Sequence, residues 1–298
     1  HFTEEETALV REMQENRQVL PSGRWLWTGG TEWLQKQKNF SGAYNCTSTR
    51  VTDWQSLALM MDLAMMGSGT GAVIEERHIE KLPVIRNRIK LKDVGDVGGS
   101  APDDRREHTY VEVRGNTVTI DCGDSRTGWV EAYEAFLDLS TDNYFDHTRP
   151  VCVYVDLHRV RAAGQKLKGF GGTSNPIKLP GIFPKMAEIL NDAYGRRLTS
   201  TEICLLIDEA AAVVVAGNIR RSAGMRQFAS NDTDAAKAKD NLWQQDEDGS
   251  WRIDPKRDAL RMANHTRVFH GQPDFPTVQD AVRKQFYSGE GAIQYVPE

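Results

Sequence analysis

The spacing of apolar and polar residues predicts a chain in which helices alternate with buried strands. Apolar residues recur on one helical face from Leu9 to Leu20, from Trp54 to Met65 and through "EICLLIDEAAAVVVAG". Each of these segments begins with Thr followed three residues later by Glu or Gln, the pattern of a capping box. The three pairs are Thr3–Glu6, Thr52–Gln55 and Thr199–Glu202. We therefore expect three capped helices, with a further helix over "GWVEAYEAFLDL".

Short runs typical of strands lie between these helices. "GAVIE" (71–75) is apolar enough for a buried strand, and "VCVYVDL" (151–157) for a strand buried on both faces. "TYVEV" and "TVTID" flank "RGN" (114–116) as a hairpin, and "IRRSAGMRQF" is strand-like. The stretch before residue 46 has scattered glycines and tryptophans with no clear period, so we expect an irregular connection there. Together these elements favour an α/β architecture with a mainly parallel sheet.

Composition narrows the class of protein. The 298 residues are 39% hydrophobic and 27% charged, and no apolar run reaches the length of ~20 residues that a membrane span needs. A net charge of −5 gives no general attraction to nucleic acid. The opening "HFTEEETALVREM" does not resemble a signal peptide, so we expect a cytoplasmic protein with free thiols and no membrane or nucleic-acid partner.

The four cysteines differ in their surroundings, and none has the spacing of a metal site. Cys152 and Cys204 lie in apolar runs typical of structural cysteines, and Cys122 is assigned to the same class. Cys46 lies in the polar segment "AYNCTSTR", where a reactive thiol and a structural one are both consistent with the sequence. His158 in "DLHRVRAAG" is not expected to bind cobalt, because the glycine of a DxHxxG pattern comes too late.

Two glycine-rich segments are candidate nucleotide loops. "GSGTG" (67–71) and "GFGGTSNP" (169–176) match no complete nucleotide-binding motif, so their spacing alone favours ordinary turns. Lys166 and Lys168 indicate an anionic ligand near the second loop. One of Arg220 and Arg221 could also bind a phosphate, because adjacent strand residues face opposite ways.

Taken in order, several segments resemble one enzyme family. They are "LPSGRWLW", "YNCTST", "MMGSGTGAVIE", "GDSRTGW", "KGFGGTSNP" and "AGNIRRSAGMRQFASND". From about residue 20 to the end, the chain resembles the adenosylcobalamin-dependent (class II) ribonucleotide reductases, in particular the monomeric type acting on ribonucleoside triphosphates. The resemblance implies a ten-stranded α/β barrel of two five-stranded parallel halves, to which this chain supplies the N-terminal part. Residues 1–45 would form a helical and irregular segment, and residues 46–298 a partial barrel with nucleotide-binding loops.

The resemblance also implies roles for individual residues. Cys46 would be one member of the redox pair that reduces the substrate, and Asn45, Ser68 and Gly69 would line the substrate nucleotide. Asp53 would contact a deoxynucleoside triphosphate effector, with Arg77, Arg86 and Arg88 as candidates for its phosphates. The loop reporting effector identity would be formed by Lys168, Gly169, Phe170, Gly171, Gly172, Thr173, Ser174 and Asn175.

The implied activity is reduction of ribonucleotides to 2′-deoxyribonucleotides, with adenosylcobalamin as cofactor and a thioredoxin-type protein as reductant. No cysteine in the chain has the sequence context of the family's radical cysteine, so we expect a fragment or a half that needs a separate C-terminal partner. Two alternatives stay open. The chain could be a catalytically incomplete nucleotide-binding regulatory or interaction protein, or an unrelated α/β enzyme that uses Cys46 as a nucleophile.

Overall fold

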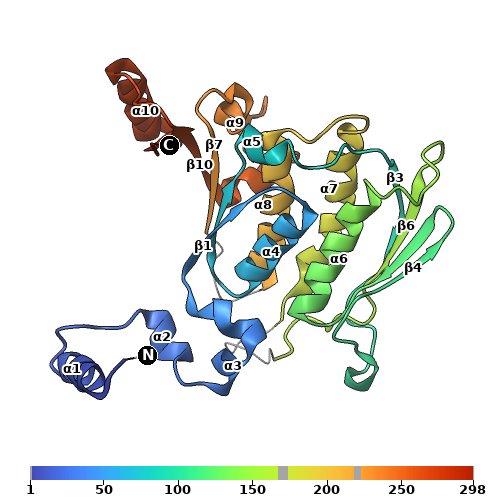
Figure 1. The fold of residues 1–298 in the computed structure, drawn as a ribbon. Helices are drawn as coiled ribbons and strands as arrows, with labels where there is room; N and C mark the ends of the chain where they lie inside the picture. Colours follow the sequence, from blue (N-terminus) through green and yellow to red (C-terminus); the bar gives the residue numbers. More distant parts are fainter. Residues whose placement is uncertain (1, 167–173, 218–222, 298) are drawn as a thin grey trace.

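The computed structural model has two main sheets with a layer of helices between them (Figure 1). It describes residues 2–166, 174–217 and 223–297. The first sheet has the strand order β1-β2-β7-β10-β11, and all of its neighbouring strands are parallel. Its strands are β1 (Cys46–Arg50), β2 (Gly69–Val73), β7 (Gly224–Ala229), β10 (Ala263–Phe269) and β11 (Ala292–Tyr295). The expectation of an α/β fold with a mainly parallel sheet is therefore confirmed.

The second sheet is mixed and has the order β3-β6-β5-β4. Its strands are β3 (Ile89–Val94), β4 (Tyr110–Arg114), β5 (Thr117–Asp121) and β6 (Val151–Asp156). Strands β4 and β5 form the expected antiparallel hairpin, and Gly115 in its turn has a φ of 58°, which favours glycine. Strand β6 is buried on one face only, because Tyr154 is exposed on the other. The prediction that this strand is buried on both faces was wrong.

Four helices fill the space between the sheets. They are α4 (Trp54–Met65), α6 (Arg126–Leu139), α7 (Leu179–Asp192) and α8 (Ser200–Gly217). Helices α4 and α8 pack on the first sheet, whereas α6 and α7 pack on the second, and α4 contacts both α6 and α8. The rings of Phe136 and Phe183 lie 5.5 Å apart where α6 meets α7. One buried apolar cluster therefore runs through both halves of the molecule.

The helix starts test the predicted capping boxes. Thr3 with Glu6 and Thr199 with Glu202 make the reciprocal hydrogen bonds of such a box. The third box is wrong by one residue, because Asp53 rather than Thr52 caps α4 by accepting a hydrogen bond from the backbone N–H of Ser56. Aspartate is an equally good N-cap, and its carboxylate also favours the positive end of the helix.

The N-terminal segment is more helical than its sequence suggested. It contains α1 (Glu4–Glu15), α2 (Gly23–Thr28), α3 (Glu32–Gln35) and the 3-10 helix η1 (Gln37–Ala43). Helix α1 ends at Glu15, before Leu20, to which the predicted apolar face extends, and it buries no residue. The segment taken as irregular consists of short helical turns, too short to give a readable apolar period.

The remaining elements are short, apart from the last helix. They are α5 (Glu76–Ile79), η2 (Pro102–Asp104), η3 (Pro176–Lys178), α9 (Thr233–Lys237), β8 (Trp243–Gln245), β9 (Trp251–Ile253), η4 (Asp258–Met262) and α10 (Phe275–Ser288). Strands β8 and β9 pair as a separate hairpin within the polar stretch after β7. None of the helices in the described ranges has the length and apolar character needed to cross a membrane.

A buried ion pair joins the middle of the first sheet to the helical layer. Arg226 on β7 and Asp208 on α8 are both fully buried, and Nη2 of Arg226 lies 2.6 Å from Oδ1 of Asp208. Nη1 of the same guanidinium donates to the carbonyl oxygen of Thr70 on the neighbouring strand β2 at 3.0 Å. Burial raises the pKa of the Asp208 carboxyl group, and the charge of Arg226 and its hydrogen bonds oppose that rise.

Replacing Asp208 by Ala should strongly destabilise the fold, because it leaves the Arg226 guanidinium buried without its counter-charge. We expect a loss of about 3–5 kcal/mol in the free energy of unfolding, measured by urea denaturation at pH 7. The matched control is Glu112→Ala, which removes an exposed ion pair to Arg114 and should change stability by about 0–1 kcal/mol. Equal effects of the two substitutions would contradict this account of the pair.

Candidate functional site

Cys46 is the first residue of β1, an edge strand of the parallel sheet, and its side chain is exposed. It lies opposite Gly69, the first residue of β2, in the strand register. A Cβ atom on Gly69 would lie 3.6 Å from Sγ of Cys46, an ordinary van der Waals distance, so the two positions are direct neighbours.

Asn45 and Ser68 lie next to this pair. Ser68 is buried and donates from its hydroxyl to the backbone oxygen of Tyr44 at 2.8 Å, and the N–H of Gly69 donates to the backbone oxygen of Asn45 at 2.8 Å. Helix α4 connects β1 to β2 and so returns the chain to the same edge of the sheet. The structure thus brings together all four residues expected on the substrate side, although their roles stay predictions.

Arg24 also belongs to this site, and the sequence analysis did not single it out. It belongs to α2 and is buried, with 6% of its surface exposed. Its Nε donates a hydrogen bond to Oδ1 of Asn45 at 2.9 Å. Its other nitrogens donate to the backbone oxygens of Gly42, Met66 and Gly67. The available signal was a single charged residue among the aromatic residues of "LPSGRWLW", a motif quoted only for its family resemblance.

The other three cysteines are not placed to react with Cys46. Burial raises the pKa of the Cys122 thiol to about 12, and burial likewise raises the pKa of the Cys204 thiol. Cys152 is half-buried and belongs to β6 in the second sheet. Cys46 is therefore the one exposed thiol of the chain, all four cysteines being among the described residues.

The residues expected to bind an effector are dispersed. Asp53 caps α4, and hydrogen bonds from Ser56 lower the pKa of its carboxyl group. The guanidinium of Arg86 donates to Asn143, whereas that of Arg88 stacks over the ring of Tyr194 at 4.5 Å. Arg77 contacts Glu75 and His270. Residues 168–173 lie outside the described residues, whereas Ser174 and Asn175 precede η3.

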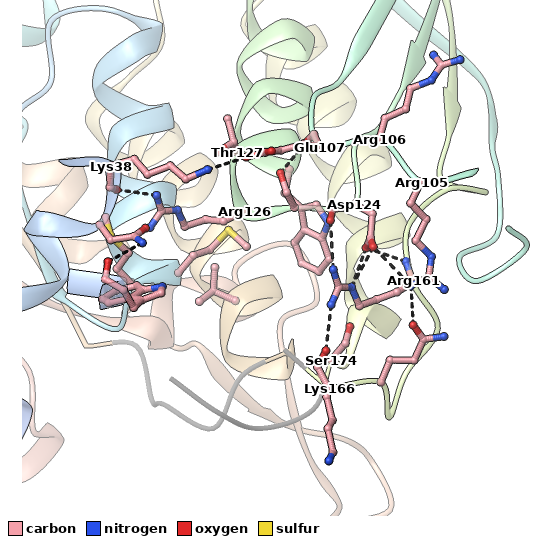
Figure 2. Close-up of a pocket in the computed structure, with 18 of the residues that line it drawn as sticks. Lys38, Arg105, Arg106, Glu107, Asp124, Arg126, Thr127, Arg161, Lys166 and Ser174 are labelled. Carbon is pink, nitrogen blue, oxygen red and sulfur yellow. Dashed lines mark hydrogen bonds and ion pairs between the residues drawn. The ribbon is translucent and has the colours of Figure 1, made fainter. Parts of the chain in front are cut away.

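A basic cavity lies at the opposite end of α4 from Asp53. Its volume is about 800 Å³, and it is bounded by the N-terminal segment, Met65 and Met66 at the end of α4, the start of α6, and Val214 on α8 (Figure 2). Glu107 and Asp124 are its acidic lining residues. Its seven basic lining residues are Lys36, Lys38, Arg105, Arg106, Arg126, Arg161 and Lys166. This excess of positive charge suits an anionic ligand.

Asp124 organises one wall of the cavity. Nε of Arg161 lies 2.9 and 3.0 Å from its two carboxylate oxygens, and Arg105 lies 3.7 Å away (Figure 2). Arg105 also donates to Oε1 of Gln165, and Arg161 donates to the backbone oxygen of Lys166. We call Asp124, Arg105 and Arg161 the Asp124 cluster. It fixes the chain that follows β6 against the start of α6.

The facing wall ties the N-terminal segment to the second sheet. Arg126 lies 2.8 Å from the carboxylate of Asp62 on α4 and donates to the backbone oxygen of Lys38 at 2.8 Å. Lys38 in turn lies 2.7 Å from Glu107. Ser125 caps α6, so the positive end of that helix lies at the cavity, where it favours an anion.

The sequence analysis missed most of these cavity residues. "GDSRTGW", which contains Asp124, Ser125 and Arg126, was quoted as a family motif without a role. The cavity joins segments far apart in the sequence, so no local spacing indicated it. No group of three or more His, Cys, Asp and Glu side chains suited to a metal ion occurs within residues 2–166, 174–217 and 223–297.

Comparison with protein families identifies one part of the chain. Residues 87–190 match the family described as the insertion domain of B12-dependent ribonucleotide reductase. This span begins just before β3 and ends within α7, so it covers the second sheet together with α6 and almost all of α7. The insertion domain therefore carries Asp124, Arg126 and Arg161, whereas Cys46 lies outside it.

Curated relatives and a solved structure agree with this match. A putative adenosylcobalamin-dependent ribonucleoside-triphosphate reductase of Mycobacterium phage D29 is 32% identical over 233 residues, which is 73% of this chain and 32% of the relative. The reductase of that name from Lactobacillus gasseri is 28% identical over 253 residues, or 72% of this chain and 33% of the relative.

A crystal structure of a B12-dependent (class II) ribonucleotide reductase superposes with a TM-score of 0.74 at 20% identity, covering 100% of this chain and 43% of the other. The chain thus spans about a third of the length of the curated relatives it matches. By sequence and by fold, it is related to the adenosylcobalamin-dependent (class II) ribonucleotide reductases.

Proposed function

We propose that this chain is the part of a class II reductase that supplies one redox thiol and an effector site for the conversion of ribonucleoside triphosphates to 2′-deoxyribonucleotides. The observation that carries this proposal is the exposed thiol of Cys46 between Asn45 and the Ser68–Gly69 segment, at the amino ends of two adjacent parallel strands. The relatives named as ribonucleoside-triphosphate reductases support the choice of substrate.

In the proposed reaction Cys46 is one of two thiols that supply the reducing equivalents. The bond between C2′ and its hydroxyl oxygen breaks, the oxygen leaves as water, and a hydrogen takes its place on C2′. The two thiols lose two hydrogens and form a disulfide, which balances the reaction. A thioredoxin-type dithiol then reduces that disulfide by thiol–disulfide exchange.

The second thiol and the radical cysteine are proposed to be residues other than Cys122, Cys152 and Cys204. Cys122 and Cys204 are buried in the core, and Cys152 belongs to β6 in the second sheet. We further propose that the five-stranded parallel sheet is one half of a ten-stranded barrel. Its outer strands β1 and β11 each have one unpaired edge in the described structure, where further strands could pair. Those strands would come from additional polypeptide, in the same chain or in a separate partner.

The cofactor of the named relatives, adenosylcobalamin, is proposed for the complete enzyme. The described residues do not form a recognisable site for it, since the cavity with its seven basic side chains suits a polyphosphate better than a corrin ring. We therefore propose that the cofactor contacts belong to other parts of the enzyme. The complete enzyme is proposed to be cytoplasmic.

The basic cavity is proposed as the effector site for a deoxynucleoside triphosphate. Its charge, its volume of about 800 Å³ and the adjacent start of α6 suit a triphosphate. Ser174, from the loop that the resemblance assigns to effector sensing, lines it. The proposed effector site thus lies at the C-terminal end of α4, beside the start of α6, and not at the N-terminal end that Asp53 caps. Arg77, Arg86 and Arg88 do not line this cavity.

A nucleotide-binding regulatory protein is the second candidate. The observation that favours it is that the described residues form a cavity with seven basic side chains, whereas the thiol chemistry needs a second accessible cysteine. The two candidates differ in one measurement, namely whether the chain supports dithiol-dependent deoxynucleotide formation when it is combined with the remaining part of a class II reductase.

Cys46 should be the fast-reacting thiol of the native protein. Titration with Ellman's reagent should show one rapid equivalent that is absent in Cys46→Ser, a slower reaction at half-buried Cys152, and reaction of Cys122 and Cys204 only after unfolding. In the complete reductase, Cys46→Ser should abolish turnover with thioredoxin as reductant. Wild-type turnover of that variant would exclude the redox role of Cys46.

Deoxyadenosine triphosphate should bind the cavity, and Lys36→Ala should weaken its affinity about threefold to tenfold through loss of one charge-assisted contact. Isothermal titration calorimetry at low and high salt measures both the affinity and its decrease with ionic strength. The matched control is Lys92→Ala on β3, an exposed lysine that does not line the cavity. Equal affinities of the two variants would place the ligand elsewhere.

A further inference from the structure

Arg24 holds together the two chain segments that lead into the Cys46 site. One segment, ending at Asn45, enters β1, and the other, Met66–Gly67, enters β2. Nη1 of Arg24 donates to the backbone oxygen of Gly42 at 3.1 Å and to that of Met66 at 2.8 Å, while Nη2 donates to that of Gly67. One guanidinium therefore sets the distance between the two segments.

The geometry suits arginine specifically. Its guanidinium is a rigid planar fork with five N–H donors, and backbone carbonyl oxygens can accept from several of them at once. Burying a charged group is costly unless its hydrogen bonds are made, and Arg24 is 6% exposed. A lysine could reach one or two of these carbonyl oxygens, but it could not also donate from a second, fixed direction to Asn45.

The contact with Asn45 fixes the orientation of that side chain. Because every guanidinium nitrogen of Arg24 carries hydrogen and none can accept, the Asn45 atom facing Nε at 2.9 Å must be the oxygen Oδ1. The amide nitrogen Nδ2 is then turned away from Arg24. Asn45 is exposed beside Cys46, so it offers an N–H₂ donor at the open side of the site.

We propose that Arg24 is a positioning residue for the substrate site, which rests on the proposed function above. It holds Asn45 with Nδ2 directed at an oxygen acceptor of the bound ribonucleotide. The ligand chemistry that this arrangement recognises is an oxygen acceptor on a nucleotide, such as a hydroxyl or phosphate oxygen.

A double-mutant cycle separates positioning from a merely structural role. The variants are Arg24→Lys, Asn45→Ala and the double substitution, in the full chain. The readout is the concentration of ATP that half-protects Cys46 from alkylation by iodoacetamide, followed by mass spectrometry of the Cys46 peptide. This readout reports on the accessibility of the Cys46 thiol itself.

Each single substitution should raise the half-protecting concentration about tenfold, and the double variant should be no worse than Asn45→Ala alone. Arg24 acts through Asn45, so its substitution has no further effect once the amide is gone. Additive effects of the two substitutions would overturn the positioning role. Arg114→Lys, at an exposed arginine of β4, is the control for the Arg-to-Lys change itself.

A variant that leaves Arg24 intact keeps the proposal testable if Arg24→Lys proves unstable. Asn45→Asp keeps an oxygen acceptor for Arg24 but loses the N–H₂ donor, so the thermal unfolding temperature should be preserved while ATP protection is lost. Wild-type protection in Asn45→Asp would overturn the proposed orientation. If ATP fails to protect Cys46 even in the wild type, the substrate site of the proposed function is itself wrong.

Discussion

The buried pair of Arg226 and Asp208 is the interaction on which the arrangement of the first sheet depends. The two side chains connect the central strand β7 to α8, and the third donor of Arg226 extends the network to Thr70 on β2. Removing two charges from water is costly, and here the ion pair and the carbonyl contacts offset that cost only in one geometry. The pair thus fixes β2 beside β7, and with it the position of Gly69 at the amino end of β2.

The candidate thiol site lies at the amino edge of the parallel sheet, although ligands of open α/β sheets usually bind at the carboxyl edge. At the carboxyl edge the chain makes its own contacts instead. Glu75 follows β2, His270 follows β10, and their side chains lie 2.6 Å apart, which raises the pKa of His270. Among the residues that the structure describes, no such ion pair joins the starts of β1 and β2 at the amino edge. Small and neutral residues there leave Cys46 accessible.

The sequence predicted the helices and strands well and the sites only partly, for identifiable physical reasons. Capping residues and apolar periods are local, so α4, α6 and α8 could be found, although Asp53 replaced Thr52 as the cap. The division into two sheets could not be predicted, because the pairing of β3 with β6 joins strands about sixty residues apart and has no local signal in the sequence. Arg24 and the Asp124 cluster were missed because their partners are mostly backbone oxygens and side chains distant in the sequence. The resemblance supplied Asn45, Ser68 and Gly69, which periodicity alone would have left as a turn.

The end of α4 belongs to both candidate sites. Met66 lines the basic cavity, and its backbone oxygen accepts a hydrogen bond from Arg24 at 2.8 Å. The insertion domain forms the far wall of that cavity and, through Arg126, holds Asp62 on the last turn of α4. A triphosphate bound between these walls would compete for Arg126 and shift the end of α4. Because Arg24 donates hydrogen bonds to both Met66 and Asn45, such a shift would change the position of the Asn45 amide beside Cys46. The two candidate sites thus share one residue, Met66, through which a ligand in the cavity would act on the amide beside Cys46.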